Sequence, residues 1–135
     1  MNRHPAPGAA RPTRHLTVAE VTEIARIAFG GRAPEARAPE LLASAVHRPR
    51  TRMFGTVAYD DVHEQAAALL HAVAVNHPLV DGNKRTAWLA AATFLALHGV
   101  DLAGCAQDAA YDLVIDVASG VESKIPAIAQ RLRAL

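Results

Sequence analysis

Two long apolar segments of the chain are separated by ten residues that are mostly polar, charged or special in their backbone: His77-Pro78-Leu79-Val80-Asp81-Gly82-Asn83-Lys84-Arg85-Thr86. The segment before them has apolar residues at helical spacing and predicts a helix that Asp60 or Asp61 caps and that reaches Asn76. The segment after them is apolar on nearly all sides over residues 87–97. We therefore predict two helices joined by a short polar loop, with the second helix, residues 83–98, at the centre of the domain.

The remaining elements are predicted outward from this pair of helices. Thr17 and Glu20 have capping-box spacing and start a helix that Gly30 and Gly31 stop. Further helices are expected over about residues 39–46, 106–119 and 123–135, with an ordered loop or hairpin over residues 47–58. The prediction is an all-α fold, a compact single domain of about six helices over residues 15–135, which follows a disordered tail over residues 1–14.

Composition and charge exclude several classes of protein. The chain has 135 residues, of which 51% are hydrophobic and 4% aromatic, so small aliphatic side chains must fill its core. A net charge of +1 offers no strongly basic surface, and we expect no direct binding to nucleic acid. The one cysteine fits a reducing compartment, and no apolar run is long enough for a membrane span. We expect a cytoplasmic protein that does not contact a membrane.

The ten quoted residues contain the parts of a site for phosphoryl-type transfer. The His77 imidazole can take a proton from a hydroxyl group, and Asp81 supplies the hard oxygen ligand that Mg²⁺ prefers. Gly82 permits a tight turn and the close approach of a ligand. The next helix presents its free N–H groups to an anion, where Lys84 and Arg85 add positive charge. Each residue alone fits a helix end or a turn, whereas the whole string favours a site.

The segment resembles the Fic/Doc motif, His-Pro-Phe-x-Asp/Glu-Gly-Asn-x-Arg-x-x-Arg, and most closely its Doc-like version, which ends Asn-Lys-Arg-Thr-Ala. The resemblance extends over roughly residues 16–135. It implies the small all-helical Fic core and an enzyme that uses ATP and Mg²⁺. It also implies that His77 is the general base, that Asp81 holds Mg²⁺, and that the nucleotide phosphates are bound by Gly82, Asn83, Lys84 and Arg85.

The resemblance further implies a flap, over residues 48–55, that docks the segment of the target protein. The alternation of Arg48, Arg50 and Arg52 predicts three guanidinium groups on one side of an extended strand. A solvated charged loop explains these arginines nearly as well.

Two positions depart from the general motif, and a third differs from its adenylylating members. Leu79 replaces phenylalanine and keeps an apolar anchor, Lys84 stands where adenylylating members usually have glycine, and Trp88 replaces the final arginine. Trp88 could lie against the nucleotide or pack in the core. The last two changes follow the Doc-like branch, which implies transfer of the terminal phosphoryl group of ATP to a Ser/Thr hydroxyl of a translation factor, elongation factor Tu, and arrest of translation.

Two alternatives stay open. Gly82 is closer to the general Fic pattern, which favours a protein adenylyltransferase that moves AMP to a Ser, Thr or Tyr hydroxyl. The second alternative is an inactive relative that only binds an antitoxin. The built-in inhibitory motif of many Fic proteins, Ser/Thr-x-x-x-Glu-Gly/Asn, does not occur in this sequence. The resemblance therefore implies a type II toxin–antitoxin system, in which a separate antitoxin of Phd type inhibits in trans.

Overall fold

Six α-helices and a small hairpin follow one another in the computed structural model, which describes residues 13–32 and 35–135. The helices are α1 (Val18–Ala28), α2 (Pro39–His47), α3 (Val62–Asn76), α4 (Asn83–Leu97), α5 (Gln107–Ser119) and α6 (Ile125–Arg133). After α2, a 3₁₀ turn (Arg48–Arg50) leads into the antiparallel strands β1 (Arg52–Met53) and β2 (Thr56–Val57). The predicted all-α core of about six helices with a short hairpin is confirmed. No helix in the described ranges has the length and apolar character to cross a membrane.

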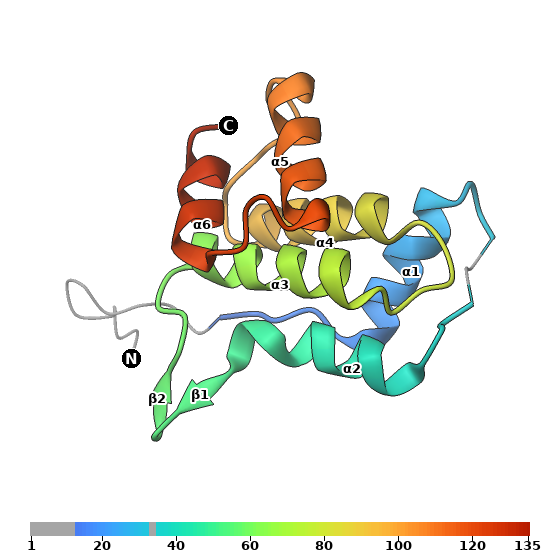
Figure 1. The fold of residues 1–135 in the computed structure, drawn as a ribbon, viewed down its shortest axis with the longest axis horizontal. Coiled ribbons are helices and arrows are strands. Elements are labelled where there is room, and N and C mark those ends of the chain that lie inside the picture. Colours follow the sequence, from blue (N-terminus) through green and yellow to red (C-terminus); the bar gives the residue numbers. More distant parts are fainter. Residues whose placement is uncertain (1–12, 33–34) are drawn as a thin grey trace, which may run out of the picture.

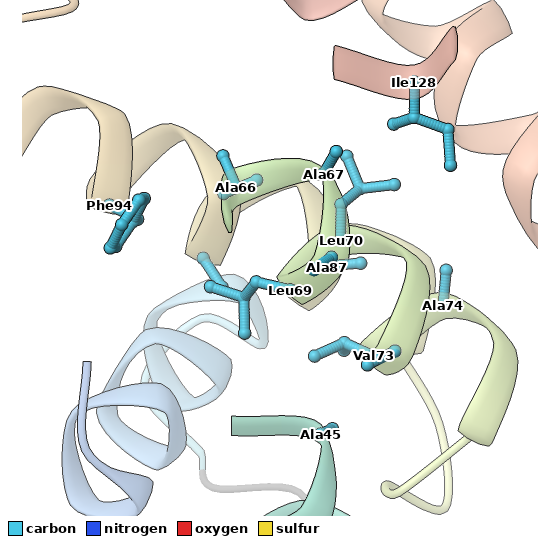
Figure 2. Close-up of a cluster of buried hydrophobic side chains, with 14 of the residues drawn as sticks. Ala45, Ala66, Ala67, Leu69, Leu70, Val73, Ala74, Ala87, Phe94 and Ile128 are labelled. Carbon is cyan, nitrogen blue, oxygen red and sulfur yellow. The ribbon is translucent and has the colours of Figure 1, made fainter. Parts of the chain in front are cut away.

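Helix α3 lies at the centre of the fold. It packs against α2, α4, α5 and α6, and Figure 1 shows the other helices arranged around it. Five of its buried positions are alanines with no exposed surface: Ala66, Ala67, Ala68, Ala72 and Ala74. Such small side chains allow neighbouring helices to approach on several sides at once. Figure 2 shows three of these alanines, Ala66, Ala67 and Ala74, with Ala45 from α2, Ala87 from α4 and Ile128 from α6.

The predicted central position of α4 is wrong. One side of α4 packs against α1 and α3, whereas another side is partly exposed and lines an open groove. That second side carries Trp88, Leu89, Ala92, Thr93 and Ala96. An apolar helix surface is favourable against a core and against a ligand groove alike, so the sequence pattern did not distinguish the two.

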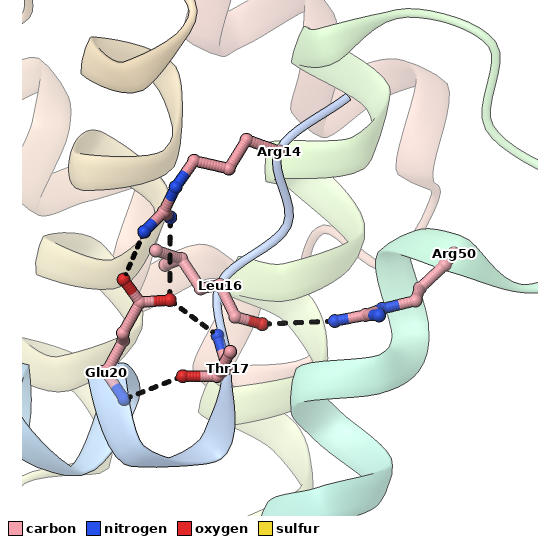
Figure 3. A network of polar contacts seen from close by, with 5 residues as sticks. All are labelled: Arg14, Leu16, Thr17, Glu20 and Arg50. Atoms are coloured by element: carbon pink, nitrogen blue, oxygen red, sulfur yellow. Dashed lines mark hydrogen bonds and ion pairs between the residues drawn. The ribbon is translucent and has the colours of Figure 1, made fainter. Parts of the chain in front are cut away.

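The start of the described chain is fixed to α1 (Figure 3). The predicted capping box is present: the Glu20 N–H donates to Thr17 Oγ1 at 3.1 Å, and the Thr17 N–H donates to Glu20 Oε1 at 3.0 Å. Arg14 donates to the same carboxylate, and this hydrogen bond lowers the pKa of Glu20. Of the predicted tail, residues 1–12 lie outside the described residues, and the backbone N–H of Arg14 donates to His98 Nε2 at 3.1 Å.

Helix α3 also separates two loops. The hairpin leads into its N-terminus, where Asp61 is the cap and accepts from the Glu64 N–H at 2.8 Å. The polar loop, residues 77–82, leaves its C-terminus. The 15 residues of α3 span about 22 Å at a rise of about 1.5 Å per residue. Figure 1 accordingly shows the hairpin at the lower left and the polar loop at the right, beside α1.

Candidate active site

His77 ends α3 and turns the chain into the polar loop. Its backbone is left-handed, with φ 49° and ψ 56°, a conformation that residues other than glycine seldom adopt. Its side chain is exposed and lines the groove. Among the residues that the structure describes, none hydrogen-bonds to the imidazole, and the backbone of His77 sets the direction of its Cα–Cβ bond.

The side chain of Asn83 bonds the backbone of the polar loop. Its Oδ1 accepts from the Leu79 N–H at 2.9 Å, and its Nδ2 donates to the Leu79 carbonyl at 3.0 Å. Both residues are buried, and Leu79 is the apolar anchor that the sequence predicts. The side-chain amide of Asn83 therefore serves the loop itself, which differs from the predicted role in binding phosphate. A phosphate contact from its backbone N–H, at the start of α4, stays a prediction.

Gly82 occupies a crowded position with a left-handed backbone. Its φ is 76°, and a Cβ atom added there would lie 2.0 Å from Cε2 of Phe29. Phe29 is the residue that ends α1, so its ring packs directly on the backbone of the loop. Asp81, the residue before, accepts from the Gly82 N–H at 2.8 Å and is exposed at the groove.

Two cations lie in the first turn of α4. The N-cap, Gly82, has no side chain to bond the first N–H groups of this helix, which remain suited to an anion. Lys84 and Arg85 are exposed and line the groove beside them. Arg85 Nη1 also donates to the Ala28 carbonyl at 3.0 Å, which ties its guanidinium group to the end of α1. The structure thus brings the predicted cations and the start of α4 together.

The groove runs along α4 from this loop and encloses about 1030 Å³. Pockets for small ligands commonly measure about 300–1,000 Å³, so the groove has room for a nucleotide and part of a second reactant. Its wall on α4 consists of Trp88, Leu89, Ala92, Thr93 and Ala96. Trp88 also packs against the core. The opposite wall comes from α5 and the segment before it, with Asp101, Leu102, Ala103, Cys105, Gln107, Ala110, Tyr111, Val114 and Ile115.

A magnesium ion fits this donor set only together with phosphates. Within residues 13–32 and 35–135, no group of three His, Cys, Asp or Glu side chains could hold a metal ion. Asp81 supplies one exposed carboxylate at the loop. Mg²⁺ commonly binds one or two carboxylates and completes its octahedron with water and substrate phosphates. The site therefore suits an ion that arrives with a nucleotide.

The predicted row of flap arginines is wrong. Arg48 and Arg50 belong to a 3₁₀ turn around Pro49, whose fixed φ suits a helical turn, and they do not form an extended strand. Arg48 points inward: its Nε donates to Tyr59 Oη at 3.3 Å, and its Nη1 lies 3.5 Å from His71 Nδ1. Burial and the nearby Arg48 charge lower the pKa of His71.

The other two arginines of this segment point elsewhere. Arg50 donates to the Leu16 carbonyl at 3.3 Å (Figure 3), and Arg52 donates to the Gly55 carbonyl at 2.7 Å within the hairpin. Neither residue, nor Arg48, lines the groove of His77, which begins at the other end of α3. A role of these arginines in docking a target stays a prediction.

The sequence did not reveal Phe29 or the wall on α5 as parts of the site. Phe29 precedes the two glycines that stop the first predicted helix, and the sequence gives it no role of its own. The residues of α5 that line the groove have ordinary helical spacing, which indicates an apolar face but not its partner. Contacts between segments distant in the chain leave no local signal.

Comparisons with known proteins show which family the chain is similar to. A model of the Fic/DOC family matches residues 15–95, which include α1, the hairpin, α3 and the polar loop. Toxin Doc of Mycolicibacterium smegmatis is 47% identical over 108 residues, which cover 79% of this chain and 82% of that protein.

Proposed function

Because the chain belongs to the Fic/DOC family, we propose that it is a Doc-type toxin that transfers the terminal phosphoryl group of ATP to a Ser/Thr hydroxyl of a translation factor. Elongation factor Tu is the first candidate, and its modification would halt translation. The similarity to a protein named Toxin Doc supports the toxin role. The observation that carries the proposal is that His77, Lys84 and Arg85 line the same end of one groove.

The proposed reaction needs a proton acceptor beside the hydroxyl group and positive charge around the phosphates. A ring nitrogen of His77 takes the hydroxyl proton while the hydroxyl oxygen bonds to the γ-phosphorus. The bond from that phosphorus to the bridging oxygen breaks, and ADP leaves with its electron pair. Lys84, Arg85 and the first N–H groups of α4 bind the phosphates. When bound, Mg²⁺ held by Asp81 would neutralise further phosphate charge.

The cations at the loop end of the groove favour phosphoryl transfer over AMP transfer. Lys84 lies in the first turn of α4, and one turn further along the groove Trp88 stands where the general motif has a second arginine. Positive charge is thus concentrated beside His77, which suits a terminal phosphate there, while the apolar walls suit the nucleoside. Gly82, which follows the general Fic pattern, makes AMP transfer to Ser, Thr or Tyr the alternative.

The proposal includes an antitoxin of Phd type that inhibits the enzyme in trans. Its support is that the sequence lacks the inhibitory Ser/Thr-x-x-x-Glu-Gly/Asn motif, so inhibition requires another chain. The proposed location is the cytoplasm, where ATP and the translation factors are present.

The first experiment uses purified protein, Mg²⁺, elongation factor Tu and ATP labelled at the α- or the γ-phosphate. We expect γ-label on the factor with the wild-type chain and none with His77→Ala. α-Label on the factor would instead establish the adenylyltransferase. If neither label is transferred, a bacterial lysate replaces the purified factor as acceptor.

Growth arrest tests the alternative of an inactive, antitoxin-binding relative. Expression of the wild-type chain should arrest growth, and the folded His77→Ala variant should not. The exposed side chain of His77 makes this variant a mild change for folding. Arrest that persists with folded His77→Ala would point to binding alone.

A further inference from the structure

Arg37 bonds three consecutive carbonyl groups at the end of α3. Its Nε donates to the His77 carbonyl at 2.8 Å, and its Nη2 donates to the Asn76 carbonyl at 3.0 Å. Its backbone N–H donates to the Pro78 carbonyl at 2.8 Å. The last carbonyls of a helix lack partners within the helix, and the helix dipole favours a cation there. The last turn of α3 has no basic residue of its own, so Arg37 supplies this cation from the connection between α1 and α2.

The backbone around Arg37 also runs antiparallel to the polar loop. Ala36 forms an isolated β-bridge with Leu79, and the Val80 N–H donates to the Glu35 carbonyl at 3.0 Å. Side-chain and backbone bonds from residues 35–37 therefore hold the chain on both sides of His77.

His77 depends on such support because no hydrogen bond from the described residues holds its imidazole. A left-handed conformation is unfavourable for a residue with a Cβ atom, so the backbone of His77 needs bonds that hold it there. A general base must lie within hydrogen-bond reach of the proton that it takes, and a shift of about 1 Å can cost roughly 100-fold in rate. The conformation at residue 77 thus decides where the imidazole lies in the groove.

We propose that Arg37 is a positioning residue for His77: by bonding the Asn76 and His77 carbonyls with its guanidinium group, it holds the left-handed backbone that presents the imidazole to the groove. Arg37 does not line the groove, so it acts through His77. The consequence for rate rests on the proposed function, in which His77 is the base. The conformation itself can be measured without any activity.

The experiment compares Arg37→Ala and Arg37→Lys with a matched control at the other end of α3. The control is Arg133→Ala, since Arg133 donates to the N-cap Asp61 at 2.5 Å and lies outside the groove. Two properties are measured for each variant: the three-bond HN–Hα coupling of residue 77 by NMR, and kcat and KM for transfer of labelled phosphate from ATP.

In Arg37→Ala we expect the coupling of residue 77 to change and kcat to fall roughly 10- to 100-fold, with KM for ATP unchanged because the cations of α4 remain. Arg37→Lys should recover part of kcat, since an ammonium group reaches one carbonyl but lacks the planar fork that bonds two. Arg133→Ala should leave the coupling unchanged.

The coupling separates failure of this proposal from failure of the proposed function. If Arg37→Ala folds with the wild-type coupling at residue 77, the proposal is overturned, whatever the activity. If the wild-type chain transfers no label but the coupling changes in Arg37→Ala, the positioning holds and the proposed function fails. A loss of kcat that Arg133→Ala reproduces in full would show a merely structural effect and would also overturn the proposal. If Arg37→Ala does not fold, Arg37→Lys decides by the same two measurements.

Discussion

The loops at the two ends of α3 each contain a non-glycine residue with positive φ, but they are held very differently. In the described ranges these two residues are His77, with φ 49°, and Phe54, with φ 53°. The backbone of His77 is bonded on both sides by residues 35–37. Phe54 is fully exposed, at the tip of a hairpin with two paired residues in each strand.

This difference shows what fixes each loop. A left-handed non-glycine residue costs about 1–2 kcal/mol wherever it lies. At His77 the hydrogen bonds from residues 35–37 stabilise that conformation and hold the polar loop in place. At Phe54 only the short hairpin maintains it, so the tip can change conformation at little cost. We therefore expect the polar loop to respond to substitutions through its neighbours, and the hairpin to respond only locally.

Gly82→Ala and Gly55→Ala give the sharpest test of this comparison, because the two glycines have nearly equal φ angles of 76° and 78°. A Cβ atom at residue 55 meets nothing within 4 Å, whereas at residue 82 it would meet Phe29 Cε2 at 2.0 Å. Both variants should lose about 1–2 kcal/mol of unfolding free energy because alanine is unfavourable at a positive φ. Overpacking should lower the unfolding free energy of Gly82→Ala by about 1–3 kcal/mol more, as measured by urea denaturation. We also expect Gly82→Ala to lose transferase activity.

A double-mutant cycle identifies the cause of that loss. In a Phe29→Ala background the space above residue 82 is open, so the added cost of Gly82→Ala should approach that of Gly55→Ala. An equal cost of Gly82→Ala in both backgrounds would show that the Phe29 ring does not exclude the Cβ atom.

The base of the hairpin should be more sensitive to substitution than its tip. Arg48→Ala removes the hydrogen bonds to Tyr59 and His71 in a partly buried position, and we expect it to lower the unfolding free energy by about 1–2 kcal/mol. Arg52→Ala removes a bond to Gly55 within the exposed hairpin and should change it by less than about 0.5 kcal/mol. Equal losses in urea denaturation would contradict the inward position of Arg48.

The elements that local chemistry determines were predictable from the sequence. Thr17 with Glu20, Asp61 and the glycines after helices mark helix ends by bonds or conformations within a few residues, and the observed helices begin and end close to them. The grouping of His77, Asp81, Lys84 and Arg85 was predictable for the same reason, since a short loop and one helical turn connect them.

Features that depend on contacts between distant segments were not predictable. The apolar surface of α4 gave no indication that α5 faces it across an open groove. Arg37 and Arg48 are alike in a sequence rich in arginine, yet one bonds the end of α3 and the other lies under the hairpin. Which carbonyl or ring an arginine reaches depends on the packed helices and not on its sequence neighbours.

Acidification should weaken the hairpin base before it affects the bonds around His77. Burial, with the nearby Arg48 charge, lowers the pKa of His71 from its ordinary value of 6.5. Below pH 6.5 the unfolded chain therefore binds more protons at His71 than the folded chain does. The unfolding free energy is at its full value above this pH and falls as the pH drops through the pKa of His71 in the folded chain. Between pH 7.5 and 5.5 we expect the protection factor of the Ala58 N–H, which bonds Thr51, to fall more than that of the Val80 N–H; the protection factor corrects for the pH dependence of intrinsic hydrogen exchange. His71→Gln should remove most of this difference; its persistence would exclude His71 as the cause.

The smallest predicted effect is a gain in stability at the hairpin tip. Phe54 and Gly55 both have positive φ, as in a type I′ turn, which strongly prefers an Asn-Gly pair. Phe54→Asn should therefore raise the unfolding free energy by up to about 1 kcal/mol, since asparagine tolerates this conformation and the exposed ring contributes no packing. Met53→Asn is the control: Met53 is also exposed but has no positive φ, so no gain is expected there. A loss of stability in Phe54→Asn would mean that the ring packs against the folded chain in solution, and the two loops would then differ less than their contacts indicate.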